Sequence, residues 1–153
     1  MLLRHFQDHG ANLVLLTPLH KHLVRRTFTR LVIDADEVLR LFRQRLGETN
    51  PLLLSLVLVE TQPYRPMEML ALIISLLDHP QVLSTKLKMM QAQQPQELVS
   101  GENLRQLGDV LLWVVEQEIG DGFTAETQTA WLEFYRYLVY LSTSHPEDLL
   151  TKP

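Results

Sequence analysis

The sequence predicts an all-α protein folded as one domain. Leucine is abundant, the alternation of β-branched residues typical of strands is scarce, and apolar residues recur three and four positions apart, as on one face of a helix. A chain of 153 residues, 46% of them hydrophobic, can bury one sizeable core. We therefore expect a single domain over residues 1–153, with its core in residues 10–142, a loose tail at 143–153, and about six to eight helices.

The first half of the chain predicts three helices in succession. Leu19, Leu23, Phe28 and Leu31 form an apolar stripe that continues into residues 32–33. Residues 36–46 form a second helix, for which Gly47 is a natural stop. Nearly unbroken leucines at 52–59 predict a third helix, which is either buried on several sides or leaves apolar surface for a partner.

Two prolines, Pro63 and Pro66, mark the sharpest break, because each lacks a backbone donor and disfavours the preceding helical turn. A helix is expected to begin at Pro66, since proline suits a first helical turn, and to end at residues 78–80. A polar helix at 80–94 follows. Residues 91–100, which contain Pro95, are expected to form a loop or an unravelled helix end.

Two long helices are predicted to end the chain. The first covers residues 101–119, and the second begins at Thr124, a good N-cap. Gly120, Asp121 and Gly122 form a tight turn between them, so we expect the two helices to pack antiparallel. The predicted buried face of the first consists of Leu104, Leu107, Leu111, Leu112 and Val115.

Composition excludes several classes of function. A net charge of -4 argues against a dedicated nucleic-acid binder, which needs basic residues to neutralise phosphates. The absence of cysteine excludes thiolate metal sites and cysteine nucleophiles. The two apolar runs, at 51–59 and 69–77, are about half of the roughly 20 residues that a membrane-spanning helix needs. The first residues lack a signal-peptide pattern, so a cytoplasmic location is expected.

Six segments in the same order resemble one family. Residues 107–112, 119–124 and 130–135, the last containing a Trp-x-Glu-x-Tyr pattern, are similar to the last two helices of bacterial globins of the haemoglobin and flavohaemoglobin lineage. Upstream, residues 28–31, 38–42 and 69–80 resemble earlier parts of that fold. The resemblance covers about residues 27–140 and implies a globin-like fold, whose first helix is divergent or shortened here.

The resemblance also implies a departure at the haem iron. The family's proximal histidine falls on Gln94, and the tyrosine and glutamate that hold this histidine fall on Leu104 and Glu133. A carboxamide offers iron only a weak oxygen donor in place of an imidazole nitrogen. On the distal side, Gln62 takes the place of the ligand-contacting glutamine. The two prolines beside it would distort that turn. We expect no haem and no metal ion.

The candidate pocket combines these positions with their apolar neighbours. Phe42 matches the phenylalanine that packs on the porphyrin in this family, although ordinary core packing explains it equally well. The predicted pocket residues are Phe42, Gln62, Pro66, Met69, Leu70, Ile73, Met90, Gln94, Leu104 and Leu107.

Three functions remain open on the sequence. The preferred one is a globin-like protein without haem, acting as a sensory or regulatory module that binds an apolar molecule such as a fatty acid. The second is a haem protein with Met90, Gln94 or His79 as an unusual axial ligand, and the third is an interaction scaffold without a pocket. Signatures of enzymes are missing, including phosphate-binding glycine loops and His-Glu-x-x-His. A homodimer through the last two helices is expected, with Trp113, Trp131, Tyr137 and Tyr140 as candidate anchors, although these aromatic residues could equally belong to the core.

Overall fold

The computed structural model describes residues 16–57, 66–94 and 101–143. These residues form seven α-helices and one short 3-10 turn, and no strand occurs among them. The helices are α2 (Pro18–Ile33), α3 (Ala35–Thr49), α4 (Pro51–Val57), α5 (Pro66–Ser75), α6 (Pro80–Ala92), α7 (Gly101–Ile119) and α8 (Ala125–Thr143), with the turn η1 (Gly120–Gly122) between the last two. The all-α prediction is confirmed.

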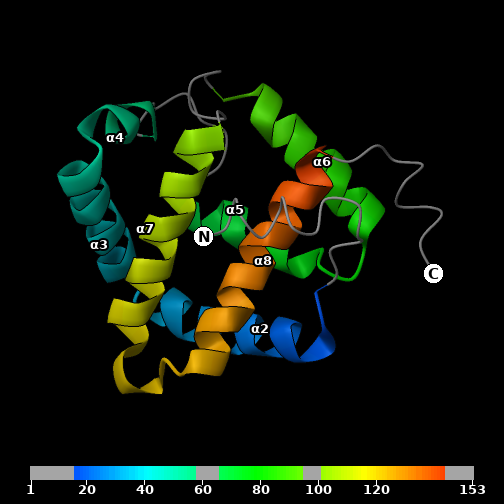
Figure 1. Cartoon of the computed structure of the whole chain (residues 1–153), viewed down its shortest axis with the longest axis horizontal. Coiled ribbons are helices and arrows are strands. Elements are labelled where there is room, and N and C mark those ends of the chain that lie inside the picture. The colour runs from blue at the N-terminus through cyan, green and yellow to red at the C-terminus, as the bar shows by residue number, and fades with distance from the viewer. Residues whose placement is uncertain (1–15, 58–65, 95–100, 144–153) are drawn as a thin grey trace.

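Helices α7 and α8 run antiparallel through the centre of the molecule (Figure 1). In this view α2 crosses below them, α3 and α4 flank α7, and α6 flanks the end of α8. The shorter α5 passes behind the central pair. The most extensive contacts join α2 to α8, α3 to α7 and α6 to α8, so α8 is held from two sides.

The tightest part of the core lies between α2 and α8. Val24 and Leu31 of α2 are fully buried there, as are Phe134 and Trp131 of α8. The indole Nε1 of Trp131 donates a hydrogen bond of 2.7 Å to the hydroxyl of buried Thr27, which itself donates to backbone carbonyls of its own helix. Because a buried indole N–H needs a partner, this bond fixes how α8 lies on α2.

Polar contacts attach the outer helices to this core. The buried hydroxyl of Ser84 in α6 donates to the carbonyl oxygen of Leu141 in α8 at 2.7 Å. Lys21 and Arg25 of α2 form ion pairs of 2.8 and 3.0 Å with Asp78, which follows α5. Asn50 accepts from the backbone N–H of Leu53 and so caps α4.

Several predicted boundaries need correction. Helix α3 continues through Gly47 to Thr49, because the helical hydrogen bonds persist past the glycine: the backbone N–H of the C-cap residue Asn50 donates to the carbonyl of Leu46 at 2.7 Å. Helix α5 ends at Ser75, three residues before the predicted stop, and residues 76–78 form turns. Helix α6 ends at Ala92, two residues before the predicted end at residue 94.

The end of the chain follows the prediction more closely. Helix α7 has the predicted bounds, and Thr124 caps α8 by accepting from the backbone N–H of Thr127 at 3.2 Å. Thr143, assigned to the loose tail, is the last residue of α8. The side-chain hydroxyls of Ser142 and Thr143 both donate to the carbonyl of Val139, one turn earlier in the helix. The rest of the tail, and residues 10–15 of the expected core, lie outside the described residues.

The predicted buried face of α7 is confirmed at Val115 and wrong at its four leucines. Leu104, Leu107, Leu111 and Leu112 are only half-buried, whereas Val110, Val114, Val115 and Ile119 are buried. Three of the four leucines, together with Val114, face a space that protein atoms do not fill.

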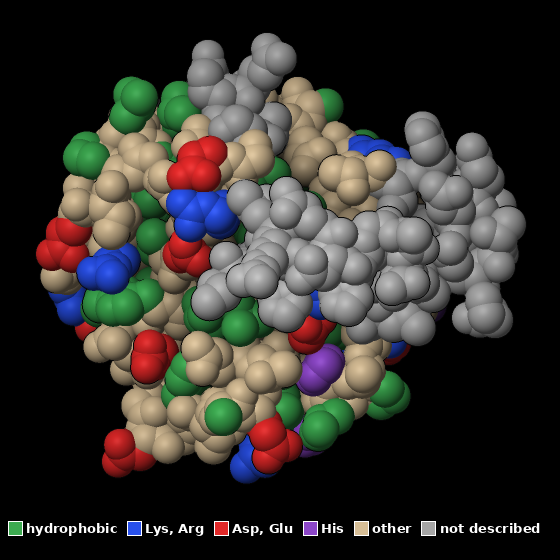
Figure 2. Space-filling view, in the orientation of Figure 1, with side chains coloured by type: hydrophobic (Ala, Val, Ile, Leu, Met, Phe, Trp, Pro, Cys, Tyr) green, Lys and Arg blue, Asp and Glu red, His purple; other side chains and the backbone are tan. Residues whose placement is uncertain are grey.

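Charges of both signs are interspersed on the surface. Figure 2 shows acidic and basic side chains side by side over α7, where Arg105 pairs with Glu102 at 2.6 Å and with Asp109 at 3.0 Å. Among the helices of the described residues, none is long and apolar enough to cross a membrane.

Candidate functional site

A cavity of about 310 Å³ lies where six helices converge. This volume is at the lower end of the range of small-molecule pockets, which is about 300–1,000 Å³. Its wall consists of Leu31 from α2; Val38, Leu39 and Phe42 from α3; Pro66, Met67, Met69, Leu70 and Ile73 from α5; Leu87, Met90 and Gln91 from α6; Gln94; Leu104, Leu107, Leu111 and Val114 from α7; and Tyr135, Leu138, Val139 and Ser142 from α8.

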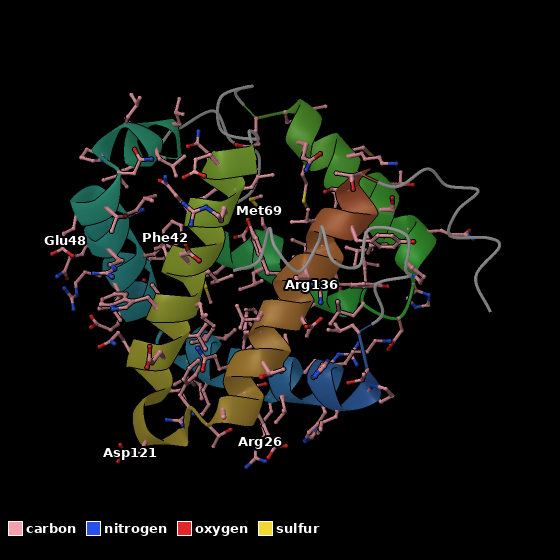
Figure 3. The ribbon with its side chains drawn as sticks, in the orientation of Figure 1. Arg26, Phe42, Glu48, Met69, Asp121 and Arg136 are labelled. Carbon is pink, nitrogen blue, oxygen red and sulfur yellow. The ribbon has the colours of Figure 1, made fainter. Side chains whose placement is uncertain are left out.

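Nine of the ten predicted pocket residues line this one cavity. The tenth, Gln62, lies outside the described residues. In Figure 3, Phe42 of α3 and Met69 of α5 lie on the inner side of the ribbon, whereas Glu48 and Asp121 lie at its outer edge. The structure thus brings the predicted residues together, while their role in binding a ligand stays a prediction.

The sequence analysis missed a dozen wall residues, but their spacing carried a signal. Leu111 lies one helical turn beyond Leu107, and Leu138 and Ser142 lie about one and two turns beyond Tyr135. Tyr135 itself belongs to the Trp-x-Glu-x-Tyr pattern. Extending each predicted residue by three or four positions along its helix would have found much of the remaining wall.

The chemistry of the wall is almost entirely apolar. Of the wall side chains in the described part of the chain, only four are polar, those of Gln91, Gln94, Tyr135 and Ser142, and none is histidine, acidic or basic. The described residues hold no group of three or more potential metal ligands of the histidine, cysteine or carboxylate type. The site therefore offers apolar surface with a few hydrogen-bonding groups, which suits the orientation of an apolar molecule.

Gln94 occupies a special place in this wall. It follows the end of α6, where its backbone N–H donates to the carbonyl of Gln91 at 3.1 Å. The side-chain oxygen Oε1 is buried and has no hydrogen-bond partner. An unpaired buried acceptor is costly, so a hydrogen-bond donor that reached this oxygen would be bound favourably.

The hydroxyl of Tyr135, unlike the side-chain oxygen of Gln94, has a hydrogen-bond partner within the protein. Its ring packs on Gly108, where an added Cβ would lie 2.7 Å from the ring, and its hydroxyl donates to the backbone carbonyl of Leu104. Burial, with a smaller contribution from Asp109, raises the pKa of Tyr135 well above its usual range. The phenol therefore stays neutral, and its proton is committed within the protein.

A family model now bears on the fold and the cavity. The globin model matches residues 25–141, which is most of the chain. The chain belongs to the globin family. No curated protein and no solved structure matches it.

The family usually binds haem, and the residues of this cavity do not fit that group. Among the described residues, the wall supplies no imidazole for the iron. The same residues supply no cationic side chain for the two haem carboxylates. The remaining donors there are thioethers, carboxamide oxygens and two hydroxyls, which are weak replacements for a proximal histidine, and the hydroxyls of Tyr135 and Ser142 already donate to backbone carbonyls.

Of the residues that the family resemblance assigns to the haem site, some line the cavity and others do not. Gln94 and Leu104 both line the cavity. Glu133 does not, because it turns to Arg136 on its own helix and pairs with it at 2.7 Å. Among the alternative axial ligands, Met90 and Gln94 line the cavity, whereas His79 is the N-cap residue of α6 and is absent from the wall.

The proposed dimer anchors need a correction as well. Trp131 and Tyr137 are buried in the core, because α2 and α6 pack on α8 at these positions. Trp113 is half-buried and lies under the guanidinium of Arg45, at 4.9 Å from the ring centroid. Of the four aromatics, Trp131 and Tyr137 therefore cannot anchor a partner in this fold.

Proposed function

We propose that this globin binds an apolar small molecule in place of haem and acts as a sensory or regulatory module. The observation that carries the proposal is the wall of the cavity, whose described residues are almost all apolar and include no charged side chain and no histidine. A site kept for haem needs an axial nitrogen and partners for the carboxylates, whereas a site for an apolar ligand needs mainly shape and hydrophobic surface. The proposal assigns no chemical reaction to the site.

The open space itself favours this function over a scaffold with a filled core. Leu104, Leu107 and Leu111 stay half-buried around it, although apolar side chains gain about 25 cal/mol for each Å² removed from water. A ligand that covers these leucines would recover that free energy. Binding would also stabilise the helices that surround the cavity, which is how occupancy can be sensed.

The decisive experiment is a hemin titration followed near 400 nm and repeated after gel filtration, combined with mass spectrometry of an organic extract of the purified protein. We expect no retained haem and a co-purifying or exchangeable apolar compound. A retained one-to-one haem complex would contradict the proposal. In that case Met90→Ala and Gln94→Leu would identify the axial ligand by their spectra.

Two further expectations accompany the proposal. The homodimer stays a prediction, now without Trp131 and Tyr137 as anchors, and a mass measurement in solution at high protein concentration tests it. The cytoplasmic location also stays a prediction, which fractionation of the source cells tests.

A further inference from the structure

We infer that the ligand of the cavity is an uncharged amphiphile whose head group is a hydrogen-bond donor, such as the hydroxyl of a long-chain alcohol, and that this donor binds Oε1 of Gln94. The inference rests on the proposed function and adds the chemical class of the ligand. It assigns to Gln94, which stands in the place of the family's proximal histidine, the role of a polar anchor.

The first support is the unpaired oxygen. Gln94 belongs to the wall of the cavity, its Oε1 is buried, and no group of the described residues donates to it. Leaving such an acceptor unpaired is costly. A ligand hydroxyl would remove that cost, whereas a purely apolar ligand would leave it in place.

The second support is the inventory of the other polar groups. The hydroxyl of Tyr135 donates to the carbonyl of Leu104, and the hydroxyl of Ser142 donates to the carbonyl of Val139 at 2.9 Å. The protons of both hydroxyls are therefore used within the protein. Among the described wall residues, Oε1 of Gln94 is therefore an unpaired acceptor, and the amides of Gln91 and Gln94 also carry N–H donors. A hydroxyl on the ligand matches this set, because it both donates and accepts.

The hydroxyl has a further advantage over other head groups. A glutamine amide can turn by half a rotation and exchange its oxygen and nitrogen, and a hydroxyl pairs with either end because it both donates and accepts. An ether or ester oxygen only accepts. An alcohol thus satisfies Gln94 in both orientations, and an ether does not.

The third support is the absence of charge around the cavity. None of the described residues that line the cavity is acidic or basic, so among them neither a carboxylate nor an ammonium head group finds an ion-pair partner. Burying an unpaired charge is much more costly than burying a hydrogen-bonded hydroxyl. A fatty acid would enter as the protonated acid, and its affinity should rise as the pH falls.

The test compares two isomers, 1-decanol and 1-methoxynonane, which have the same composition and differ in the donor. Equilibrium dialysis against the wild-type protein, with the ligand quantified by gas chromatography, gives both dissociation constants. We expect 1-decanol to bind about tenfold more tightly, as expected for one good hydrogen bond to a buried acceptor. In Gln94→Leu the two isomers should bind within about twofold of each other.

Gln91→Leu is the matched control. Gln91 is the same residue type, lies one turn earlier on the same side and lines the same cavity, but holds no buried unpaired atom. This variant should keep the tenfold preference. Thermal unfolding followed by circular dichroism verifies that both variants fold, and the wild-type comparison of the two isomers needs no variant at all.

The outcomes separate the inference from the proposed function. Equal binding of the isomers to wild type, or a preference that survives in Gln94→Leu, overturns the inference and leaves an apolar ligand site. Tighter binding of decanoate than of 1-decanol at pH 7 overturns the claim of an uncharged head group. If neither isomer binds at its solubility limit, the inference and the proposed function both fail.

Discussion

The two sides of α8 differ in how completely their side chains are packed and hydrogen-bonded. Toward α2, Trp131 and Phe134 pack edge to face with ring centroids 5.4 Å apart, and the indole N–H has its partner in Thr27. Toward α5, α6 and α7, leucines remain half-buried around open space and the oxygen of Gln94 has no donor. The packed side therefore holds the helices together, while the cavity side leaves polar and apolar groups without partners.

The strongest test of this comparison uses one substitution on each side. Phe134→Ala removes a fully buried ring from the packed side and should lower the free energy of unfolding by about 3–5 kcal/mol. Phe42→Ala removes a half-buried ring that already faces the cavity, so about 1–2 kcal/mol is expected. Urea unfolding followed by circular dichroism measures both. Equal losses would contradict the division into two sides.

The helix bounds at the end of the chain were largely visible in the sequence. The cap at Thr124, the turn at residues 120–122 and the periodicity of α7 are local signals, and they predicted the bounds of α7 and the start of α8. A local signal failed at Gly47, where helix α3 continues to Thr49 and the backbone N–H of Asn50 still donates to the carbonyl of Leu46.

The cavity side was visible only in part. The family resemblance led to nine of its wall residues, because it supplied the order in which helices meet around a common site. The same leucines suit a filled core and an open pocket, so the half-buried state of Leu104 and Leu107 could not be predicted from their identity. The partner of Glu133 was also missed, although Arg136 lies three residues further along the same helix.

Thr27→Val tests the hydrogen bond on the packed side. Valine has the shape of threonine but cannot accept from Nε1 of Trp131, which would remain buried and unpaired. The free energy of unfolding should fall by about 1–3 kcal/mol. Thr29→Val is the control, because Thr29 is exposed on the same helix and donates only to its own backbone; it should change stability by less than about 0.5 kcal/mol. Equal effects of the two variants would show that the Trp131 contact adds nothing.

Gly108→Ala tests the border between the two sides. The new Cβ would lie 2.7 Å from the ring of Tyr135, so the ring must move and its hydroxyl must leave the carbonyl of Leu104. We expect a net loss of about 1–2 kcal/mol, since overpacking outweighs the gain in helix propensity. Gly101→Ala meets nothing within 4 Å and should not be destabilising. A neutral result at position 108 would mean that the cavity accommodates the displaced ring without cost.

The smallest predicted effect lies at the C-terminal end of α7, far from the cavity. Burial and the neighbouring carboxylate of Asp34 raise the pKa of Glu118; Glu37 adds to the rise, and Arg30 opposes it. A carboxyl group whose pKa is raised by folding stabilises the protein while protonated, and that contribution is lost as the pH rises through the raised pKa. Glu118→Gln removes the charge and should be more stable than wild type at pH 7 by less than about 1 kcal/mol, with the difference closing toward pH 4. Glu116→Gln, at an exposed position on the same helix, serves as the control in urea unfolding at both pH values. A stability difference between Glu118→Gln and wild type that stays constant from pH 4 to pH 7 would contradict this prediction, as would a wild type that is the more stable at pH 7. Either result would show that the Asp34–Glu118 pair does not destabilise the fold.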